Sequence, residues 1–385
     1  MTFEAAKSQL EDLLKNAFNL RMVSDVPVGV FLSGGYDSSL VTAILQSQQH
    51  AKLKTFTIAF DDPKYDESKF ANEIATLLGT DHSTFVCSEK NAMDIIPKLA
   101  DYFDEPFGDP SLIPTMLLSE KTKEKVTVSL SADAGDETFF GYNSYEKIHR
   151  YYYKLKRMGP LANIVNKLKK NDFREKYYSV NFNKKDALAR MLDIYHQKYK
   201  DAFVQTIFNV KIDPLKTNFD SEAYDSIEMF HKLLAIDYTT YMADNILVKV
   251  DRATMSASLE GREPLLDHRI VEFAARLPMR YLFEPKTRTK KYILRELCHK
   301  YLPKELMDRK KTGFTPPILS WLRTDLKEFT VQMLSEDELD KHRLLNVKTI
   351  TIALQRFMAG DDKYYNLIWN ALVFQIWYEK WMDNE

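Results

Sequence analysis

The residues with the clearest chemical potential lie in one glycine-rich turn. A hydrophobic run rich in β-forming residues, 28–32, is followed by Gly34 and Gly35, and a helical pattern begins at Ser38. A strand, a glycine-rich turn and a helix in this order can cradle phosphate, because glycine lets the backbone approach an anion and the helix N-terminus directs free N–H groups at it. Asp37, in the same turn, could bind a metal ion. The turn therefore predicts a site for a phosphate-bearing ligand.

The sequence of this turn separates it from two common nucleotide-binding loops. It lacks the lysine of a Walker A loop, and its glycines do not have the G-x-G-x-x-G spacing. Residues 33–39, Ser-Gly-Gly-Tyr-Asp-Ser-Ser, instead resemble the pyrophosphate loop (PP-loop) of the ATP pyrophosphatases, which cleave ATP to AMP and pyrophosphate. The competing interpretation is an ordinary strand-to-helix turn, in which glycine and serine are common. We favour the nucleotide site.

A second turn, after the hydrophobic run 126–130, carries three carboxylates: Asp133, Asp136 and Glu137. Carboxylates next to small residues suit a Mg-ATP site, where Asp136 could bind the metal and another acid could transfer a proton. A solvated acidic surface loop is the alternative. We expect a functional loop, because it should lie opposite the glycine-rich turn at the same edge of a sheet.

Charged residues inside apolar patterns are further candidates. Lys249, Asp251 and Arg252 interrupt an apolar helical pattern, where a charge is costly to bury without a partner. They predict either an ion-pair network or a substrate pocket. Lys291, at the start of a later helical pattern, could reach ATP phosphates, although a lysine on a helix surface is usually solvated.

The elements that must position these residues alternate between helices and strands. The i, i+3, i+4 pattern predicts helices over residues 4–18, from 38, from 66 to 78, and near 91–102 and 113–122. Strands are expected at residues 28–32, 53–60, 83–87 and 126–130. This alternation predicts an α/β fold, a parallel twisted sheet with helices on both faces, together with a large helical portion. Ligands of such sheets bind beyond the carboxyl ends of the strands, so the loops after residues 32, 60 and 130 should meet.

The length fits a large α/β domain with an insertion, or two domains. The pattern along the chain predicts a nucleotide-binding core at residues 20–145, a helical insertion at 146–230 and a helical remainder at 231–385 that completes the site. The insertion is basic and aromatic, which could indicate RNA binding, but a solvated helical face is the more common cause. The chain has 54 lysines and arginines against 55 acidic residues, which gives no reason to expect nucleic acid or a membrane as partner. Two cysteines and the lack of a signal peptide or spanning apolar run predict a cytoplasmic protein.

Several motifs in series resemble the synthetase domain of the glutamine-dependent asparagine synthetase family over most of the 385 residues. The matching segments, in chain order, are Val26-Pro-Val-Gly-Val-Phe-Leu-Ser-Gly-Gly, Asp104-Glu-Pro-Phe-Gly-Asp, Leu130-Ser-Ala-Asp-Ala-Gly-Asp-Glu, Lys249-Val-Asp-Arg, Glu260-Gly-Arg-Glu-Pro-Leu-Leu-Asp-His-Arg, Lys291-Tyr-Ile-Leu-Arg and Lys311-Thr-Gly-Phe-Thr-Pro-Pro. The resemblance implies an adenine-nucleotide alpha-hydrolase-like fold.

The resemblance also implies roles for individual residues. The positions that would bind ATP are Leu32, Ser33, Gly34, Gly35, Asp37, Ser38, Ile58 and Ser131. Asp37 and Asp136 would bind Mg²⁺, Lys291 would stabilise the charge that builds up as pyrophosphate leaves, and Asp133 would act in the ammonia step. Candidates for the substrate side are Lys249, Asp251, Arg252, Glu260 and Glu263.

In the implied reaction, a substrate carboxylate is adenylated, and aspartate is the acceptor we expect. Ammonia then displaces AMP to give the amide, asparagine. The family's glutaminase domain begins with a catalytic cysteine after Met removal, whereas residue 2 here is Thr. Either the chain is therefore an excised domain, or ammonia arrives free or from a separate glutaminase chain; an oligomer is compatible with the sequence.

Several positions depart from the family pattern: Tyr36, Ala132, Ala134, Gly261 and Glu263. These departures leave open the same chemistry on a sugar uronic acid of a surface-polysaccharide pathway. A catalytically degenerate nucleotide-binding protein and an RNA-modifying PP-loop enzyme are further alternatives. The intact loop argues against the first of these two, and the lack of paired catalytic cysteines argues against the second.

Overall fold

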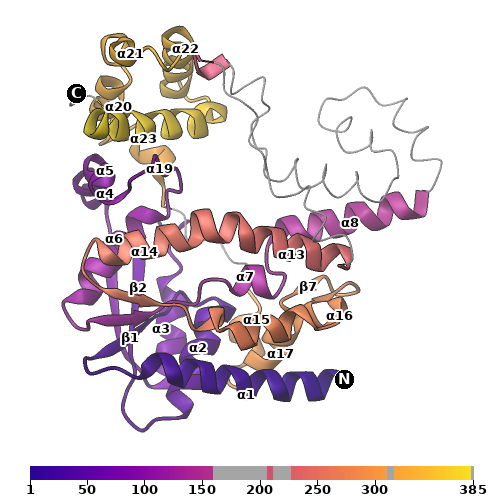
Figure 1. Cartoon of the computed structure of the whole chain (residues 1–385). Helices are drawn as coiled ribbons and strands as arrows, with labels where there is room; N and C mark the ends of the chain where they lie inside the picture. Colours follow the sequence, from indigo (N-terminus) through magenta and orange to yellow (C-terminus); the bar gives the residue numbers. More distant parts are fainter. Residues whose placement is uncertain (159–205, 211–226, 310–315, 383–385) are drawn as a thin grey trace.

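A parallel sheet of five strands lies at the centre of the computed structural model (Figure 1), which describes residues 1–158, 206–210, 227–309 and 316–382. The strand order is β3-β2-β1-β4-β5, and each neighbouring pair is parallel. The strands are β1 (Val28–Phe31), β2 (Lys54–Phe60), β3 (Asp81–Cys87), β4 (Val128–Leu130) and β5 (Glu260–Arg262). This architecture confirms the predicted α/β fold.

Apolar side chains cover both faces of the sheet. Val30 and Leu32 belong to one cluster of buried side chains, whereas Phe31 packs against a second cluster that contains Phe56 and Ile58 of β2. Because successive side chains of a strand point to opposite faces, the two clusters lie on opposite sides of the sheet. Strands that are buried on both faces read as continuous apolar runs, which is why residues 28–32 show no alternation of polar residues.

The helices divide between these two clusters. The first cluster is built with α1 (Phe3–Met22), α2 (Tyr36–Ser47), α3 (Ser68–Leu78), α13 (Met229–Thr239), α15 (His268–Ala275) and α17 (Tyr292–Cys298). The second is built with α4 (Glu89–Ile95), α5 (Leu99–Tyr102), α6 (Leu112–Lys123), α14 (Val248–Met255) and the C-terminal helices. The remaining elements are α7 (Gly135–Thr138), α8 (Asn143–Met158), α16 (Met279–Leu282), α18 (Lys304–Met307), the π-helical segment η4 (Met242–Leu247), the short 3₁₀ turns Ile96–Lys98, Pro264–Leu266 and Asp362–Tyr364, and the antiparallel pair β6 (Phe283–Glu284) and β7 (Thr289–Lys290).

The C-terminal helices gather at the end of the molecule opposite α1 (Figure 1). They are α19 (Ile318–Trp321), α20 (Lys327–Met333), α21 (Glu336–His342), α22 (Val347–Met358) and α23 (Tyr365–Trp381). Three tryptophans of α23 donate their indole N–H groups to backbone carbonyls of residues 100–108: Trp369 to Gly108 (2.7 Å), Trp377 to Asp104 (2.8 Å) and Trp381 to Ala100 (3.0 Å). These hydrogen bonds fasten α23 to the segment 100–108.

The fifth strand lies within residues 231–385, which the sequence predicts to be helical. Its residues Glu260–Arg262 pair with Val128–Leu130 of β4. A strand of three residues is too short to show a period of two against the surrounding helical pattern. Most of the predicted helical insertion at 146–230, and most of the motif that begins at Lys311, lie outside the described residues.

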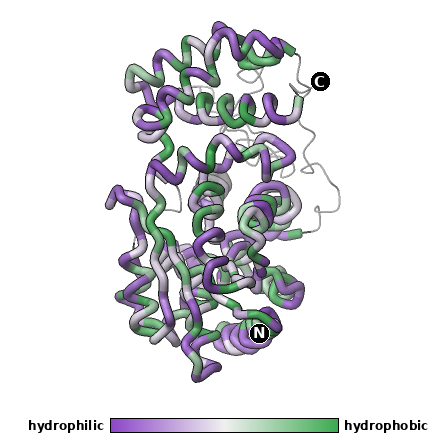
Figure 2. The backbone as a smooth tube through the Cα atoms, turned by 90° about the vertical axis from the view of Figure 1, so that its left-hand side faces the viewer, coloured by the Kyte–Doolittle hydropathy of each residue, from purple (hydrophilic) through white to green (hydrophobic). Residues whose placement is uncertain are grey.

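Hydrophobic stretches along the helices are short and are interrupted by hydrophilic residues (Figure 2). Among the helices that the structure describes, none has the length and the apolar character needed to cross a membrane. The apolar residues serve mainly the two clusters around the sheet.

Candidate active site

The strand order determines where a ligand can bind. Chain order runs from β1 to β2 on one side of the sheet and returns to β4 on the other side of β1. Open α/β sheets bind ligands beyond the carboxyl ends of the strands at such a reversal. A cavity of about 190 Å³ lies there, and we call it the strand-end pocket. It is lined by the loops after β1 and β4, by β2, and by residues of α6, η4 and α14.

The predicted meeting of three loops is correct for two of them. The loop after β2 does not line the strand-end pocket; Phe56, Thr57 and Ile58 of the strand itself do. The register explains this difference. Phe31, the last residue of β1, pairs with Phe56, while β2 continues to Phe60, so the loop that follows β2 lies farther along the strand direction.

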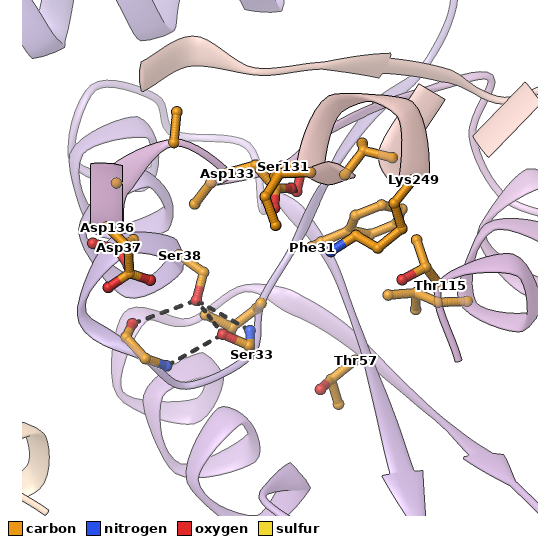
Figure 3. A pocket seen from close by; sticks show the side chains of 18 of the residues that line it. Phe31, Ser33, Asp37, Ser38, Thr57, Thr115, Ser131, Asp133, Asp136 and Lys249 are labelled. Carbon is orange, nitrogen blue, oxygen red and sulfur yellow. Dashed lines mark hydrogen bonds between the residues drawn. The ribbon is translucent and has the colours of Figure 1, made fainter. Parts of the chain in front are cut away.

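The glycine-rich turn is held by hydrogen bonds between its serines (Figure 3). Ser33 donates its backbone N–H to Ser38 Oγ (3.1 Å), and the two hydroxyl oxygens lie 3.0 Å apart. Gly34 has φ 75°, a left-handed conformation that favours glycine. Gly35 caps α2 without a side chain, so the first turn of the helix is open to an anion. The turn thus has the geometry of a phosphate cradle.

A buried lysine joins the two acidic positions. Lys291 Nζ lies 2.5 Å from Asp37 Oδ2 and 2.8 Å from Asp136 Oδ1, and its side chain is 9% exposed. Burial alone would lower the pKa of Lys291, but the charges of Asp136 and Asp37 raise it above its ordinary value. The lysine is therefore charged at neutral pH, and it stands between a carboxylate from the β1 side and one from the β4 side.

The backbone at Lys291 is adapted to this position. Lys291 has φ 52°, a left-handed conformation that is uncommon for a residue with a side chain, and it immediately precedes α17. Such a conformation costs of order 1–3 kcal/mol and persists where the surrounding structure enforces it. The short strand β7 ends at Lys290, so one residue must turn the chain from strand to helix while its ammonium group reaches both carboxylates.

The two acidic positions fit Mg²⁺ bound together with nucleotide phosphates. Asp37 Oδ1 is buried and makes no hydrogen bond with the described residues, so an oxygen ligand is available. No cluster of three or more metal-ligating side chains occurs in the described part of the chain. Magnesium keeps several waters and phosphate oxygens in its coordination shell, so one or two carboxylates suffice.

Two glycines leave room for this arrangement. A Cβ atom on Gly135 would lie 2.7 Å from Asp37 Cγ, and one on Gly141 would lie 1.9 Å from Asp136 Oδ1 and 2.1 Å from Lys291 Cε. Neither distance is possible for a real methyl group. The side chains of Asp37, Asp136 and Lys291 therefore occupy the space that a Cβ atom on either glycine would need.

Replacing Gly141 with alanine should disrupt the site. The added methyl group must displace Asp136 or Lys291, and overpacking of this kind costs about 1–3 kcal/mol of unfolding free energy. Chemical denaturation would measure the loss. The matched variant Gly261→Ala, whose Cβ would lie 3.2 Å from the nearest heavy atom, should lose less. Equal stability losses in the two variants would contradict the crowding at Gly141.

The acidic loop after β4 is not a solvated surface loop. Ser131 donates a hydrogen bond from its hydroxyl to Asp133, and both residues line the strand-end pocket. Glu137 is 2% exposed, and its carboxylate accepts a hydrogen bond from the Tyr142 hydroxyl. Burial raises the pKa of Glu137 to about 7. The carboxylates of the loop thus have different partners: Ser131 for Asp133, Lys291 for Asp136 and Tyr142 for Glu137. Asp133 is held at the pocket wall.

The charged residues of α14 separate into two groups. Lys249 is 9% exposed, lines the strand-end pocket opposite Asp37 and Asp136, and has no ion pair or hydrogen bond with any described residue (Figure 3). Asp251 is exposed, and Arg252 forms a surface ion pair with Asp104 (3.0 Å). The pocket interpretation of this segment therefore fits Lys249, and the ion-pair interpretation fits Arg252.

The candidates on β5 and directly after it lie outside the strand-end pocket. Glu260 is exposed and accepts a hydrogen bond from Arg262 Nε (2.6 Å). Glu263 is partly buried and lines a groove on the outer surface. Burial and the charges of Asp133 and Asp251 raise the pKa of Glu263 to about 7.

The apolar end of the strand-end pocket contains residues that were not among the predicted site residues. Leu32 and Ile58 line it as expected, and Phe31, Phe56, Thr57, Thr115 and Leu118 line it as well. The sequence predicted one ATP-binding residue at β1 and one on β2. The pairing of the two strands shows which neighbouring residues reach the same cavity. An apolar wall of this kind suits a nucleoside base.

A second cavity, of about 110 Å³, lies on the other side of Lys291 and shares Gly35, Asp37 and Asp136 with the strand-end pocket. We call it the second pocket. Three further cations line it: Lys290, Arg295 and Arg309. Arg309 donates hydrogen bonds to the Gly34 carbonyl (3.0 Å) and to Glu67 (3.2 Å), and so ties a distant segment to the glycine-rich turn.

Tyr36, one of the departures from the family pattern, points away from the strand-end pocket. Its hydroxyl donates a hydrogen bond to Asp308 Oδ1 (2.6 Å) and lies 2.9 Å from His299 Nε2. The Arg295 guanidinium lies over its ring, 4.4 Å from the centroid. The tyrosine therefore connects α2 to α17 and the chain after α18.

Comparison with known proteins agrees with this geometry. The family model described as asparagine synthase matches residues 9–379. The chain is 31% identical to glutamine-hydrolyzing asparagine synthetase 1 of Bacillus subtilis over 385 residues, which cover 96% of this chain and 58% of that protein. It is 26% identical to glutamine-hydrolyzing asparagine synthetase 3 of the same organism over 346 residues, 84% of this chain and 52% of that protein.

A fungal protein, amidase chyE of Penicillium rubens, is 26% identical over 393 residues, 91% of this chain and 58% of that protein. The chain therefore spans little more than half the length of the curated relatives it matches. The family model covers nearly the whole chain, and the glycine-rich turn, the acidic loop after β4 and Lys249 line one pocket. This chain belongs to the asparagine synthase family.

Proposed function

We propose that the chain is an ATP-dependent carbon–nitrogen ligase that adenylates the side-chain carboxylate of aspartate and then transfers ammonia to it. The observation that carries this proposal is the Lys291 ammonium group, which is buried between Asp37 and Asp136 beside an open glycine-rich turn. A fixed cation beside a phosphate cradle can stabilise the charge that develops when an ATP phosphate leaves.

The two pockets support a particular placement of ATP. The apolar end of the strand-end pocket, with Phe31 and Ile58, would hold the base. The phosphates would then run along Ser33 and Ser38 toward Lys291. Because the second pocket is rich in cations, the pyrophosphate leaving group would lie on that side. The α-phosphate would remain in the strand-end pocket, where the acceptor carboxylate can reach it.

The charged residues between the two pockets would reduce the electrostatic repulsion between the substrates. An acceptor carboxylate and three phosphates repel one another, and a carboxylate is a poor electrophile until it is adenylated. Lys291 offsets part of the negative charge, and Asp37 and Asp136 would hold Mg²⁺. The metal, when bound, neutralises charge on the phosphate oxygens. Lys249 is a buried cation with no ion-pair partner among the described residues, and it is suited to hold an anionic group of the acceptor.

Asp133 would act in the second half of the reaction. It lines the strand-end pocket and is oriented by the Ser131 hydroxyl, without contact to Lys291 that would tie it to the phosphates. A carboxylate in this position can accept a proton from the nitrogen that attacks the acyl carbon. Ammonia would come from solution or from a glutaminase.

Replacing Asp133 with alanine should slow amide formation more than pyrophosphate release. Loss of a proton acceptor typically lowers a rate by about 10²–10⁴-fold, and this loss should fall on the ammonia step. Rapid-quench measurement of the first turnover would separate the two products. If pyrophosphate release and amide formation decreased equally, Asp133 would not have the proposed role.

The acceptor is tested by incubating the chain with Mg-ATP, ammonium and a panel of carboxylates that includes aspartate, glutamate and a uronic acid. We expect pyrophosphate release with aspartate and the formation of asparagine. Release with a uronic acid alone would keep the chemistry and change the substrate. A raised melting temperature with Mg-ATP, but no release with any carboxylate, would favour a nucleotide-binding protein without catalysis.

A further inference from the structure

Arg295 differs from the other described cations that line the second pocket. The other three have hydrogen-bond acceptors on the protein: Asp37 and Asp136 for Lys291, the Gly34 carbonyl and Glu67 for Arg309, and Asn143 for Lys290. The side chain of Arg295 makes one hydrogen bond with the described residues, a long one from Nη1 to Asp308 Oδ1 (3.4 Å). A guanidinium carries five N–H donors, so most donors of Arg295 remain available to an anion in the pocket.

Arg295 lies beside Lys291 along the wall of the second pocket. The two residues are one turn of α17 apart, and the backbone N–H of Arg295 donates to the Lys291 carbonyl (2.8 Å). Residues four apart lie on the same face of a helix, and both of these side chains line the second pocket. A phosphate group in this pocket would therefore meet a second cation next to Lys291.

The aromatic ring of Tyr36 holds the guanidinium of Arg295. The centre of the guanidinium lies 4.4 Å from the ring centroid, within the range of a cation–π interaction. The Tyr36 hydroxyl donates to Asp308 Oδ1 (2.6 Å), the same oxygen that accepts the hydrogen bond from Arg295. Tyr36 and Asp308 thus fix the position of the guanidinium while they use only one of its N–H donors.

Tyr36 is itself part of the glycine-rich turn. It is the first residue of α2, directly after Gly35 and directly before Asp37, and it lines the second pocket. The residue that holds Arg295 is therefore rigidly connected to the turn that has the geometry of a phosphate cradle. Asp308 is exposed and lies 3.9 Å from Lys304, so water and a second cation offset its charge on the outer side.

We propose that Tyr36 is a positioning residue that holds Arg295 in the second pocket, where the guanidinium binds the outer phosphates of ATP and the pyrophosphate that leaves. This inference rests on the proposed function, in which the base and the α-phosphate occupy the strand-end pocket. Neither side chain forms or breaks a covalent bond. Arg295 would donate hydrogen bonds to phosphate oxygens, and Tyr36 would act only through Arg295.

Binding of pyrophosphate and of AMP separates this role from a structural one. Calorimetry in the presence of Mg²⁺ would measure both affinities. Arg295→Ala should weaken the affinity for pyrophosphate about 10–100-fold, because charge-assisted hydrogen bonds are lost. Tyr36→Leu should weaken it about 3–10-fold, the range of a cation–π contact. The affinity for AMP should stay unchanged in both variants, because AMP would lie in the strand-end pocket, and its binding also shows that the variants fold.

Two comparisons test whether Tyr36 acts through Arg295. Tyr36→Phe keeps the ring and should retain most of the affinity for pyrophosphate that Tyr36→Leu loses. In a chain that already carries Arg295→Ala, the change Tyr36→Leu should cause no further loss. The control Tyr102→Leu, which changes an exposed tyrosine of α5, should bind pyrophosphate and AMP as the wild type does.

Several results would overturn the assignment. These are an equal loss of pyrophosphate and AMP affinity in Tyr36→Leu, an unchanged affinity for pyrophosphate in Arg295→Ala, or the same loss from Tyr36→Leu with and without Arg295. None of these measurements requires turnover. If the chain released no pyrophosphate with any carboxylate but bound it in the expected Tyr36-dependent way, the proposed ligase activity would be wrong and the assignment of Tyr36 and Arg295 would stand.

Discussion

Replacing Lys291 with methionine should lower the rate of pyrophosphate release by about 10²–10³-fold, the range found when one preorganised electrostatic contact is removed from an active site. Methionine retains most of the apolar length of lysine but removes the charge that lies 2.5 Å from Asp37 and 2.8 Å from Asp136. The loss should appear in the chemical step more than in ATP affinity, because the charge matters most as pyrophosphate departs. Single-turnover kinetics would measure it.

The same variant should also change stability in a metal-dependent way. Without Lys291, the two carboxylates face each other, and removing one partner of a buried ion pair costs about 3–5 kcal/mol. Mg²⁺ should recover part of this loss by binding between them. The exposed Lys348→Met variant should show neither effect. If the Lys291→Met variant released pyrophosphate at the wild-type rate, the proposed role of the lysine would be wrong.

Replacing Asp37 with asparagine should reduce ATP turnover by about 10³-fold or more, because one change affects two functions. Asparagine has nearly the shape of aspartate, but it cannot balance the charge of Lys291 and is a weaker ligand for Mg²⁺. Asp37 Oδ1, which makes no hydrogen bond with the described residues, is the oxygen we expect the metal to use.

Asp37→Asn should differ from Lys291→Met in its effect on ATP binding. Asp37→Asn should weaken the affinity for ATP in the presence of Mg²⁺ more than in its absence, as measured by calorimetry at several Mg²⁺ concentrations. The control Asp12→Asn changes an exposed aspartate of α1 and should leave both affinities unchanged. An unaltered dependence on Mg²⁺ in Asp37→Asn would show that Asp37 does not hold the metal.

Local sequence signals predicted the parts of the site that are built from neighbouring residues. The glycine-rich turn needs a left-handed glycine at position 34 and serines that bond across five residues, and both features are visible in the residues themselves. The parallel sheet followed from apolar runs that alternate with helical patterns. Family motifs added Lys291, whose helical neighbourhood alone would suggest a solvated residue.

Features that depend on distant segments could not be predicted in this way. Strand β5 forms because residues 260–262 pair with β4, which is distant in the sequence. Three residues are too few to show the period of a strand. Whether Lys249 or Arg252 faces the pocket depends on the rotation of α14 against α6, which decides that Lys249 is buried and that Arg252 reaches Asp104. The cations of the second pocket come from segments more than 250 residues after the glycine-rich turn, and no local pattern connects them.

The central claim is that the acceptor carboxylate attacks the α-phosphate of ATP. The most direct test supplies aspartate labelled with a heavy oxygen isotope in its side-chain carboxylate, together with Mg-ATP and ammonium, and analyses the products by mass spectrometry. Attack at the α-phosphate should give asparagine, pyrophosphate and AMP that carries one labelled oxygen from the carboxylate. Unlabelled AMP, or ADP and phosphate in place of AMP and pyrophosphate, would contradict it.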